Sequence, residues 1–257
     1  LISSSVSPNS ITVNSSGLFV AVGTNGSSQF AYCTSTDGVT WSSINLFNSA
    51  TTTGTMYDIA VNSAGRFVAV GLNSSNAVYY STSTDGSTWT TPAVVSSANN
   101  SYVSVATDNS KFSIICDNAV NAISLVYTST TGTSWTNQGS FSADTYAIAY
   151  SSVSGWVGVG YGKYSTSPDG ITWTPTAFSG GSQTIIGRSI AANSSGTFVF
   201  GADGTNWLVG TSTLLPVATS NGGMVLFKNR TNSTQNWAVY DTARGANKSL
   251  STNTTSI

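Results

Sequence analysis

Aspartate supplies every side-chain carboxylate in this sequence, which has nine aspartates and neither glutamate nor histidine. Glycoside hydrolysis needs two carboxylates that flank the scissile bond, and a nucleophilic triad needs a base such as histidine. Outside three similar Asp-Gly turns, the available carboxylates belong to Asp58, Asp108, Asp117, Asp144, Asp203 and Asp241. Asp108 and Asp203 read as turn residues, and Asp241 lies outside the repeats described below. The sequence therefore predicts a protein that is not an enzyme.

A second group of side chains is better suited to binding. Five repeated segments begin with equivalent residues, which are Asn9, Tyr57, Tyr102, Tyr146 and Arg188, and Asp58 stands in the next column. Tyrosine rings stack on flat sugar faces, while their hydroxyl groups form hydrogen bonds. This column therefore predicts a carbohydrate-binding mouth. The alternative is that these residues only pack together and form a solvated rim.

The segments that carry these residues repeat along the chain. Residues 9–23, 57–71, 102–116, 146–160 and 188–201 align with a period of about 40 to 48 residues, which is the length of one four-stranded propeller blade. Each copy reads as four short strands, with an Asn/Gly turn between the first two. We predict an all-β, five-bladed β-propeller of four-stranded blades over residues 1–219, with repeats near 9–56, 57–101, 102–145, 146–187 and 188–219.

A Gly turn followed by tryptophan recurs in the first four repeats. The phrases STDGVTW, STDGSTW and SPDGITW occupy residues 35–41, 83–89 and 167–173, and the remaining copy has Thr131 in place of aspartate. We expect each carboxylate to accept hydrogen bonds from its own turn and each tryptophan to cover the turn. The residues with these structural roles are Asp37, Trp41, Asp85, Trp89, Trp135, Asp169 and Trp173. Calcium binding is the alternative role for the carboxylates, but Ca²⁺ takes about six or more oxygen ligands.

These phrases resemble the Asp-box, or BNR repeat, of sialidases and of many secreted or viral propellers, with one residue fewer between Asp and Trp. The resemblance implies a β-propeller fold and makes sialidase activity an alternative function. Sialidases use an arginine triad, a tyrosine paired with glutamate, and an aspartate as acid. This sequence has no glutamate, and only Arg66 and Arg188 of its four arginines lie in the repeats. The catalytic set of the family therefore has no counterpart that can be carried over.

The composition argues against several kinds of partner. Only 7% of residues are charged and the net charge is −1, whereas nucleic-acid binding needs a basic face. No apolar run approaches the ~20 residues of a membrane-spanning helix, so membrane insertion is not expected. Cys33 and Cys116 fall at non-equivalent positions of the repeat and are predicted to be unpaired buried thiols. A disulfide or a shared metal is the alternative; we expect no metal and no cofactor.

The first and last repeats indicate how the ring of blades could close. The fifth repeat lacks a clear fourth strand, because LLPVAT stands where its Asp-Gly turn should be. The segment LISSSVS, residues 1–7, precedes the first strand of the first repeat. We predict that this segment supplies the missing outer strand and closes the ring. The alternative is that further blades lie upstream.

From about Gly222 the repeat stops, and residues 220–257 read as the β-rich start of a truncated second domain. MVLFKNR and WAVYDTARG are expected to form two strands. This segment resembles the opening of a domain found in tail-fibre and other structural proteins of tailed phages, through residues 224–230, 241–245 and Lys248. A generic β-hairpin linker is the alternative.

The resemblance implies a non-catalytic virion-surface or tail-fibre protein of a tailed phage, located on the virion surface and therefore extracellular. Its propeller would attach to host cell-surface glycans or another host receptor, or would act as a structural spacer. Other virion proteins and a homotrimer are the partners that a fibre implies. The alternatives are a secreted or cell-surface microbial adhesin and a sialidase-like glycosidase.

Overall fold

A computed structural model describes residues 6–49, 52–97, 99–118, 120–178, 185–203, 209–212, 224–227, 238–241 and 249–251. The chain divides into two compact units, Leu1–Leu214 and Leu215–Ile257. In the described residues, the regular structure is β-strand apart from one 3-10 turn at Phe47–Ser49. These residues contain no helix that could cross a membrane.

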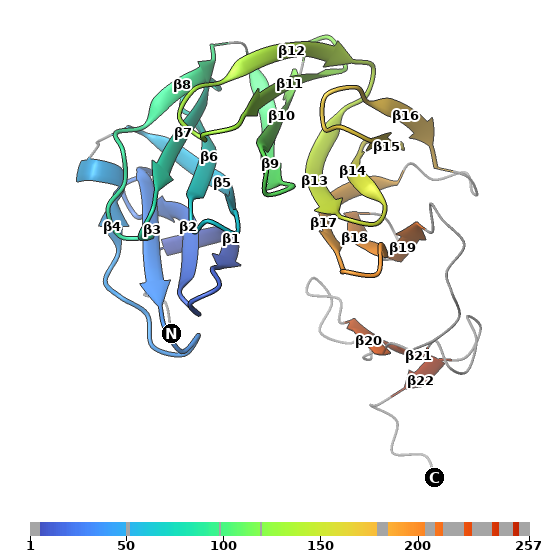
Figure 1. Cartoon of the computed structure of the whole chain (residues 1–257), viewed down its shortest axis with the longest axis horizontal. Helices are drawn as coiled ribbons and strands as arrows, with labels where there is room; N and C mark the ends of the chain where they lie inside the picture. The colour runs from blue at the N-terminus through green and yellow to red at the C-terminus, as the bar shows by residue number, and fades with distance from the viewer. Residues whose placement is uncertain are drawn as a thin grey trace. The chain divides into compact units, whose positions relative to one another are not determined.

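Antiparallel sheets follow one another along the first unit, and each sheet keeps its strands in chain order (Figure 1). The first sheet holds β1 (Val6–Val13), β2 (Phe19–Asn25), β3 (Phe30–Ser35) and β4 (Asn45–Leu46). The second holds β5 (Gly54–Val61), β6 (Phe67–Asn73), β7 (Val78–Ser83) and β8 (Ala93–Ser96). The third holds β9 (Asn100–Thr107), β10 (Phe112–Asn118), β11 (Ile123–Ser129) and β12 (Thr136–Phe141). The fourth holds β13 (Thr145–Ser151), β14 (Gly155–Gly160), β15 (Lys163–Ser167) and β16 (Thr174–Ala177). In its described part the fifth sheet has three strands, β17 (Ile186–Ala192), β18 (Phe198–Asp203) and β19 (Val209–Ser212).

Asparagine and glycine set the turn between the first two strands of a sheet. In the first sheet the Asn14 Oδ1 atom accepts hydrogen bonds from the backbone N–H groups of Ser16 at 3.1 Å and Leu18 at 2.9 Å. Gly17 takes a positive φ of 84°, a conformation that side chains with a Cβ resist. Asn193 repeats these contacts in the fifth sheet. The turn residues thus fix where each hairpin reverses.

Consecutive sheets pack face to face, so the middle strands bury both faces. In β6, Phe67 and Ala69 join a core shared with the first sheet, whereas Val68 and Val70 join a core shared with the third. Two further cores lie between the third and fourth sheets and between the fourth and fifth. The first strands of neighbouring sheets also contact one another in chain order. Four-stranded antiparallel sheets packed in this way are β-propeller blades.

The predicted closed ring of five blades is not confirmed, because the first sheet has an uncovered face in the described residues. The third residue of each aligned segment packs against the preceding sheet, and its exposed fraction is 5% for Ile59, 4% for Ser104 and 5% for Ile148. The equivalent Ile11 is 55% exposed. Among the described residues, therefore, nothing covers β1 as the preceding sheets cover the other first strands.

The predicted role of the N-terminal segment is wrong for its last two residues. Val6 and Ser7 pair with Asn25 and Thr24 of β2, so they lengthen β1 and do not form an outer strand of the fifth sheet. Residues 1–5 lie outside the described part of the chain. The β1–β2 pairing continues through these two residues after a register shift between Pro8 and Ser10.

In the second unit, β20 (Met224–Phe227), β21 (Ala238–Asp241) and β22 (Ser249–Ser251) form one antiparallel sheet. The pairing of β20 with β21 runs from Met224 opposite Asp241 to Phe227 opposite Ala238. The two segments expected to form strands therefore contain β20 and β21. The other residues that carry the tail-fibre resemblance, 228–230, 242–245 and Lys248, lie outside the described residues.

Candidate functional site

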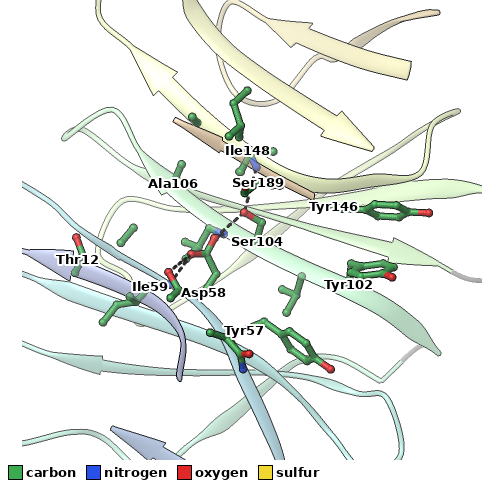
Figure 2. Close-up of a pocket in the computed structure, with 18 of the residues that line it drawn as sticks. Thr12, Tyr57, Asp58, Ile59, Tyr102, Ser104, Ala106, Tyr146, Ile148 and Ser189 are labelled. Carbon is green, nitrogen blue, oxygen red and sulfur yellow. Dashed lines mark hydrogen bonds between the residues drawn. The ribbon is translucent and has the colours of Figure 1, made fainter. Parts of the chain in front are cut away.

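A cavity of about 580 Å³ lies where the first strands of the five sheets meet. It is lined by residues 9–12 of β1, 57–61 of β5, 102–107 of β9, 146–150 of β13 and 188–190 of β17 (Figure 2). All six residues predicted to bind a ligand are among them: Asn9, Tyr57, Asp58, Tyr102, Tyr146 and Arg188. We call the end of the cavity at which these strands begin the mouth.

Three of the predicted residues come together at the mouth from three consecutive sheets. The ring centroids of Tyr102 and Tyr146 are 4.0 Å apart, and the ring planes make an angle of 36°. The guanidinium carbon of Arg188 lies 5.2 Å from the Tyr102 centroid and 5.3 Å from the Tyr146 centroid, within the range of cation–π attraction. The Arg188 Nη1 group also donates a hydrogen bond to the Tyr102 hydroxyl. We call these three residues the mouth site.

Asn9 and Tyr57 lie on the cavity wall with different surroundings. The Asn9 Nδ2 group donates a 2.8 Å hydrogen bond to the Met56 carbonyl oxygen, which ties β1 to β5. The Tyr57 side chain is 38% exposed. Asn9 therefore contributes to packing between the first two sheets, and Tyr57 presents its ring on the wall.

Asp58 braces several sheets. Its carboxylate accepts hydrogen bonds from Ser10 Oγ at 2.8 Å, Ser104 Oγ at 2.6 Å and the Val105 backbone N–H at 3.0 Å. Ser104 Oγ in turn accepts a 3.1 Å hydrogen bond from the Ile148 N–H (Figure 2). Burial raises the pKa of Asp58, while the hydrogen bonds that it accepts oppose the rise. Its carboxylate accepts hydrogen bonds from protein donors in two neighbouring sheets, and its predicted contact with a ligand stays a prediction.

Sequence analysis counted Asp117 and Asp144 among the available carboxylates but did not place them beside the mouth site. Asp117 of β10 lies directly opposite Tyr102 of β9, and Asp144 is two residues before Tyr146. Burial, followed by the charge of Asp144, raises the pKa of Asp117 to about 7. The alignment of the repeats could have found this pair only together with the β9–β10 register.

The arrangement of these carboxylates does not suit glycoside hydrolysis. Glycosidases hold their two carboxyl groups about 5 to 9.5 Å apart, on either side of the bond, whereas burial and then the charge of Asp144 raise the pKa of Asp117. Asp117 is also only 4% exposed. Among the described residues, no group of three or more Asp, Glu, His or Cys side chains could hold a metal ion.

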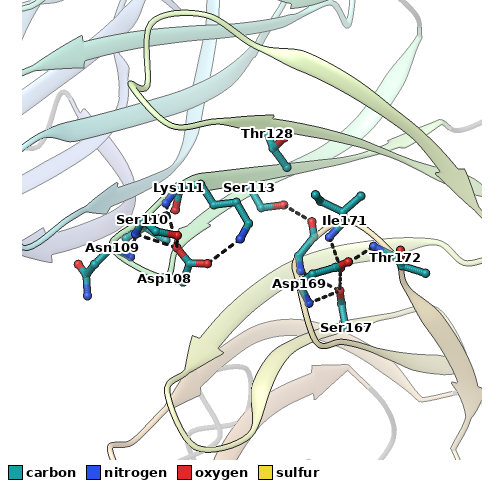
Figure 3. A network of polar contacts seen from close by, with 12 residues as sticks. Asp108, Asn109, Ser110, Lys111, Ser113, Thr128, Ser167, Asp169, Ile171 and Thr172 are labelled. Atoms are coloured by element: carbon teal, nitrogen blue, oxygen red, sulfur yellow. Dashed lines mark hydrogen bonds and ion pairs between the residues drawn. The ribbon is translucent and has the colours of Figure 1, made fainter.

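The Asp-Gly turns lie at the opposite end of the sheets from the mouth. In the second sheet the last residue of β5, Val61, pairs with Phe67, and Phe67 pairs with Ser83, two residues before Asp85. In the fourth sheet the Asp169 carboxylate accepts hydrogen bonds from the backbone N–H groups of residues 171 and 172, both at 2.8 Å (Figure 3). The turns of the first and second sheets have the same contacts. These carboxylates are occupied by their own backbone.

The hydrogen bonds within the turns lower the pKa of their carboxylates, as Asp37 shows. Its Oδ1 atom accepts from the backbone N–H groups of Thr40 at 2.7 Å and Val39 at 2.8 Å. These bonds lower the pKa of Asp37 to about 2, because they favour the ionised carboxylate. In the turn of the third sheet, the Thr131 hydroxyl accepts only a longer 3.3 Å bond from the Thr133 N–H.

The turns of the second, third and fourth sheets each accept a hydrogen bond from the preceding sheet. Tyr32 of β3 donates a 2.6 Å hydrogen bond to the Ser87 carbonyl, and Tyr80 of β7 donates a 2.7 Å bond to the Thr133 carbonyl. Ser113 of β10 donates a 3.0 Å bond to the Gly170 carbonyl (Figure 3). Of the four turn tryptophans, Trp89 and Trp173 are buried and Trp41 and Trp135 are half-buried. This end of the molecule is therefore an interface between sheets.

No protein-family model and no curated protein sequence matches the chain. Solved structures resemble it in fold. A protein from Lactobacillus plantarum aligns over 97% of this chain and 85% of its own, at 13% identity and a TM-score of 0.62. YCF48 bound to a D1 peptide aligns over 92% and 67%, at 16% identity and 0.53. The Hadza microbial sialidase aligns over 90% and 62%, at 12% identity and 0.51.

These similarities describe the fold and leave the activity open. The similar structures include enzymes, such as a streptogramin B lyase and the sialidase, as well as YCF48 in its peptide complex. Such low identities carry no activity from one protein to another. The sheets, their packing and the structural neighbours together identify a β-propeller fold.

Proposed function

We propose that this protein is a non-catalytic β-propeller that binds a host-surface glycan at its mouth. The mouth site carries the proposal, because three consecutive sheets bring two tyrosine rings and a guanidinium group into contact beside a cavity of about 580 Å³. Ligand pockets for small molecules are typically about 300 to 1,000 Å³. Aromatic faces stack on sugar rings, and hydroxyl and guanidinium groups provide directed hydrogen bonds.

The carboxylates support binding over catalysis. Asp58 accepts hydrogen bonds from neighbouring sheets, and Asp117 is buried. The turn carboxylates are bonded to their own backbone. None of these described carboxylates is therefore arranged as one of two groups flanking a substrate bond.

The location on a phage virion rests on a separate observation. The tail segment resembles tail-fibre and other structural proteins of tailed phages, which would place the propeller on the virion surface with other virion proteins and in a homotrimer. Antibody labelling of purified phage particles that carry this chain tests the location. Labelled particles would support it, and label only on the producing cell surface would favour an adhesin.

A glycan array with matched variants tests the binding proposal. Wild-type protein should retain a subset of printed oligosaccharides, and Tyr102→Ala or Tyr146→Ala should weaken retention by about two- to tenfold, since an aromatic contact is worth about 0.5 to 1.5 kcal/mol. Tyr161→Ala is the control, because Tyr161 is 49% exposed and is not among the residues that line the cavity. Equal retention by all three variants, or hydrolysis of a printed glycan, would contradict the proposal.

A further inference from the structure

The lining of the cavity changes from polar and aromatic at the mouth to aliphatic further in. The third residue of the aligned segment is isoleucine in four of the five sheets, and all four line the cavity: Ile11, Ile59, Ile148 and Ile190. Figure 2 shows Tyr57, Tyr102 and Tyr146 at one end of the cavity and Thr12 and Ala106 toward the other. We call the part of the lining beyond the second residue of each segment the inner wall; it consists of residues 11–12, 59–61, 104–107, 148–150 and 190.

Several aliphatic side chains of the inner wall keep part of their surface uncovered. Ile11 is 55% exposed, and Ala106, Ala149 and Ile190 are half-buried. These four residues line one cavity from four different sheets, the first, third, fourth and fifth. Apolar surface gains free energy when a ligand removes it from water. The inner wall can therefore bind an apolar group.

The polar groups at the start of the inner wall are already bonded to one another. The Ser10 and Ser104 hydroxyl groups both donate to the Asp58 carboxylate. The backbone N–H groups of Ile59 and Val105 donate to the same carboxylate at 2.8 Å and 3.0 Å. A sugar hydroxyl group at this depth would compete for donors and acceptors that are in use, and a polar group buried without a partner costs free energy. An aliphatic chain has no such cost.

We propose that the inner wall binds an aliphatic chain carried by the glycan that the mouth site holds. The ligand class is thus a saccharide with an alkyl or acyl substituent. The two parts of the site are continuous, because Arg188 of the mouth site and Ile190 of the inner wall lie two residues apart on β17. A mostly apolar lining with a few polar groups that fix orientation is typical of ligand pockets. The inference rests on the proposed function, because the mouth site supplies the contact with the sugar.

Alkyl glycosides of increasing chain length test the inference on the full chain. Affinity would be measured by titration calorimetry for the methyl, butyl and hexyl glycosides of glucose, galactose and mannose. For a sugar that binds, affinity should rise about fourfold for each CH₂ group that reaches the inner wall, which is the gain from burying one such group. Equal affinity for the methyl and hexyl glycosides would overturn the inference.

Variants connect this gain to the inner wall. Ile11→Ser should lower the ratio of hexyl to methyl affinity several-fold, and the exposure of Ile11 means that no packed core is opened. Ala149→Phe should also lower the ratio, because the added ring occupies the space of the chain. Val39→Ser is the control and should keep the ratio, since Val39 is 73% exposed and is not among the residues that line the cavity. An unchanged ratio in both inner-wall variants would contradict the inference.

Two further ligands separate the inference from the proposed function. Hexyl triethylene glycol carries the chain without a sugar, and maltotriose is a glucose trisaccharide without a chain. If hexyl triethylene glycol binds as tightly as the hexyl glycosides, the proposed function is refuted and the aliphatic site stands. If the methyl glycosides bind and a longer chain adds nothing, the proposed function stands and the inference fails. Tighter binding of maltotriose than of hexyl glucoside would show that a sugar chain fills the cavity, and would also overturn the inference.

Discussion

Replacing Asp58 by alanine should destabilise the propeller strongly, because Asp58 links three sheets around the cavity. The substitution removes the acceptor for the Ser104 hydroxyl and for the Val105 N–H, and both residues are buried. A buried donor left without a partner costs about 1 to 3 kcal/mol. Two such donors predict a loss of about 2 to 6 kcal/mol. Ser10 is half-buried, so its hydroxyl can turn toward solvent at little cost.

Urea unfolding followed by tryptophan fluorescence measures this loss. The midpoint should fall while the slope stays constant, since the buried surface of the fold is unchanged. Ser10→Ala is the matched control, and it should cost about 1 kcal/mol because it removes one hydrogen bond and leaves the carboxylate with its other donors. Equal costs for Asp58→Ala and Ser10→Ala would refute the account of a three-sheet brace.

The pH dependence gives a second check on Asp58. Burial raises its pKa above the unfolded value, so its stabilising contribution is complete below the unfolded pKa and is lost as pH rises through the folded one. The difference in unfolding free energy between wild type and Asp58→Ala should therefore be larger at pH 5 than at pH 8. A difference that grows with pH would show that the carboxylate is more stable ionised in the folded state.

The turns at the far end of the sheets give three further outcomes. Gly86→Ala should cost about 1 to 3 kcal/mol more than Gly17→Ala, because a Cβ at 86 would lie 2.8 Å from a Leu18 methyl group while one at 17 meets nothing within 4 Å; equal urea midpoints would contradict this. Thr131→Asp should stabilise the third turn by about 0.5 to 1 kcal/mol through a charge-assisted acceptor, and an unchanged melting temperature would argue against it. The pKa of Asp37 is lowered to about 2, so its contribution is present above the usual aspartate pKa and lost as pH falls through about 2. Wild type and Asp37→Asn should therefore differ in urea midpoint at pH 6 and converge near pH 2, and a constant difference would refute the assignment.

The distance along the chain between interacting residues decided what the sequence could predict. The Asp85 carboxylate bonds to backbone groups two and three residues ahead, so the residue types alone indicated the turn. Asp58 bonds to Ser10 and Ser104, which are 48 and 46 residues away. Those contacts depend on how neighbouring sheets are placed, and the repeat alignment only put the residues in adjacent columns.

How the ring closes and where Asp117 lies both depend on which strands pair and in which register, and the sequence alone does not show this. Val6 and Ser7 continue β1 because their neighbour β2 is close in sequence, and pairing of nearby strands costs less chain entropy than pairing across the whole unit. Asp117 was located only by its register opposite Tyr102. The sequence predicted the column of tyrosines but not that Arg188 would lie against two of them.

The repeat itself explains why a site would form at the mouth and not at the other end. At the turn end, equivalent positions carry equivalent residues with equivalent hydrogen bonds, as in Asp37 and Asp85, and these bonds join each carboxylate to the backbone of its own turn. At the mouth, one column presents Tyr102, Tyr146 and Arg188 on successive sheets. A ring of identical residues would offer a ligand several equal partial sites, whereas different residues on neighbouring sheets make one orientation more favourable than the rest. In the proposed function, the break in the repeat at this column would therefore give a repetitive scaffold a single place to bind.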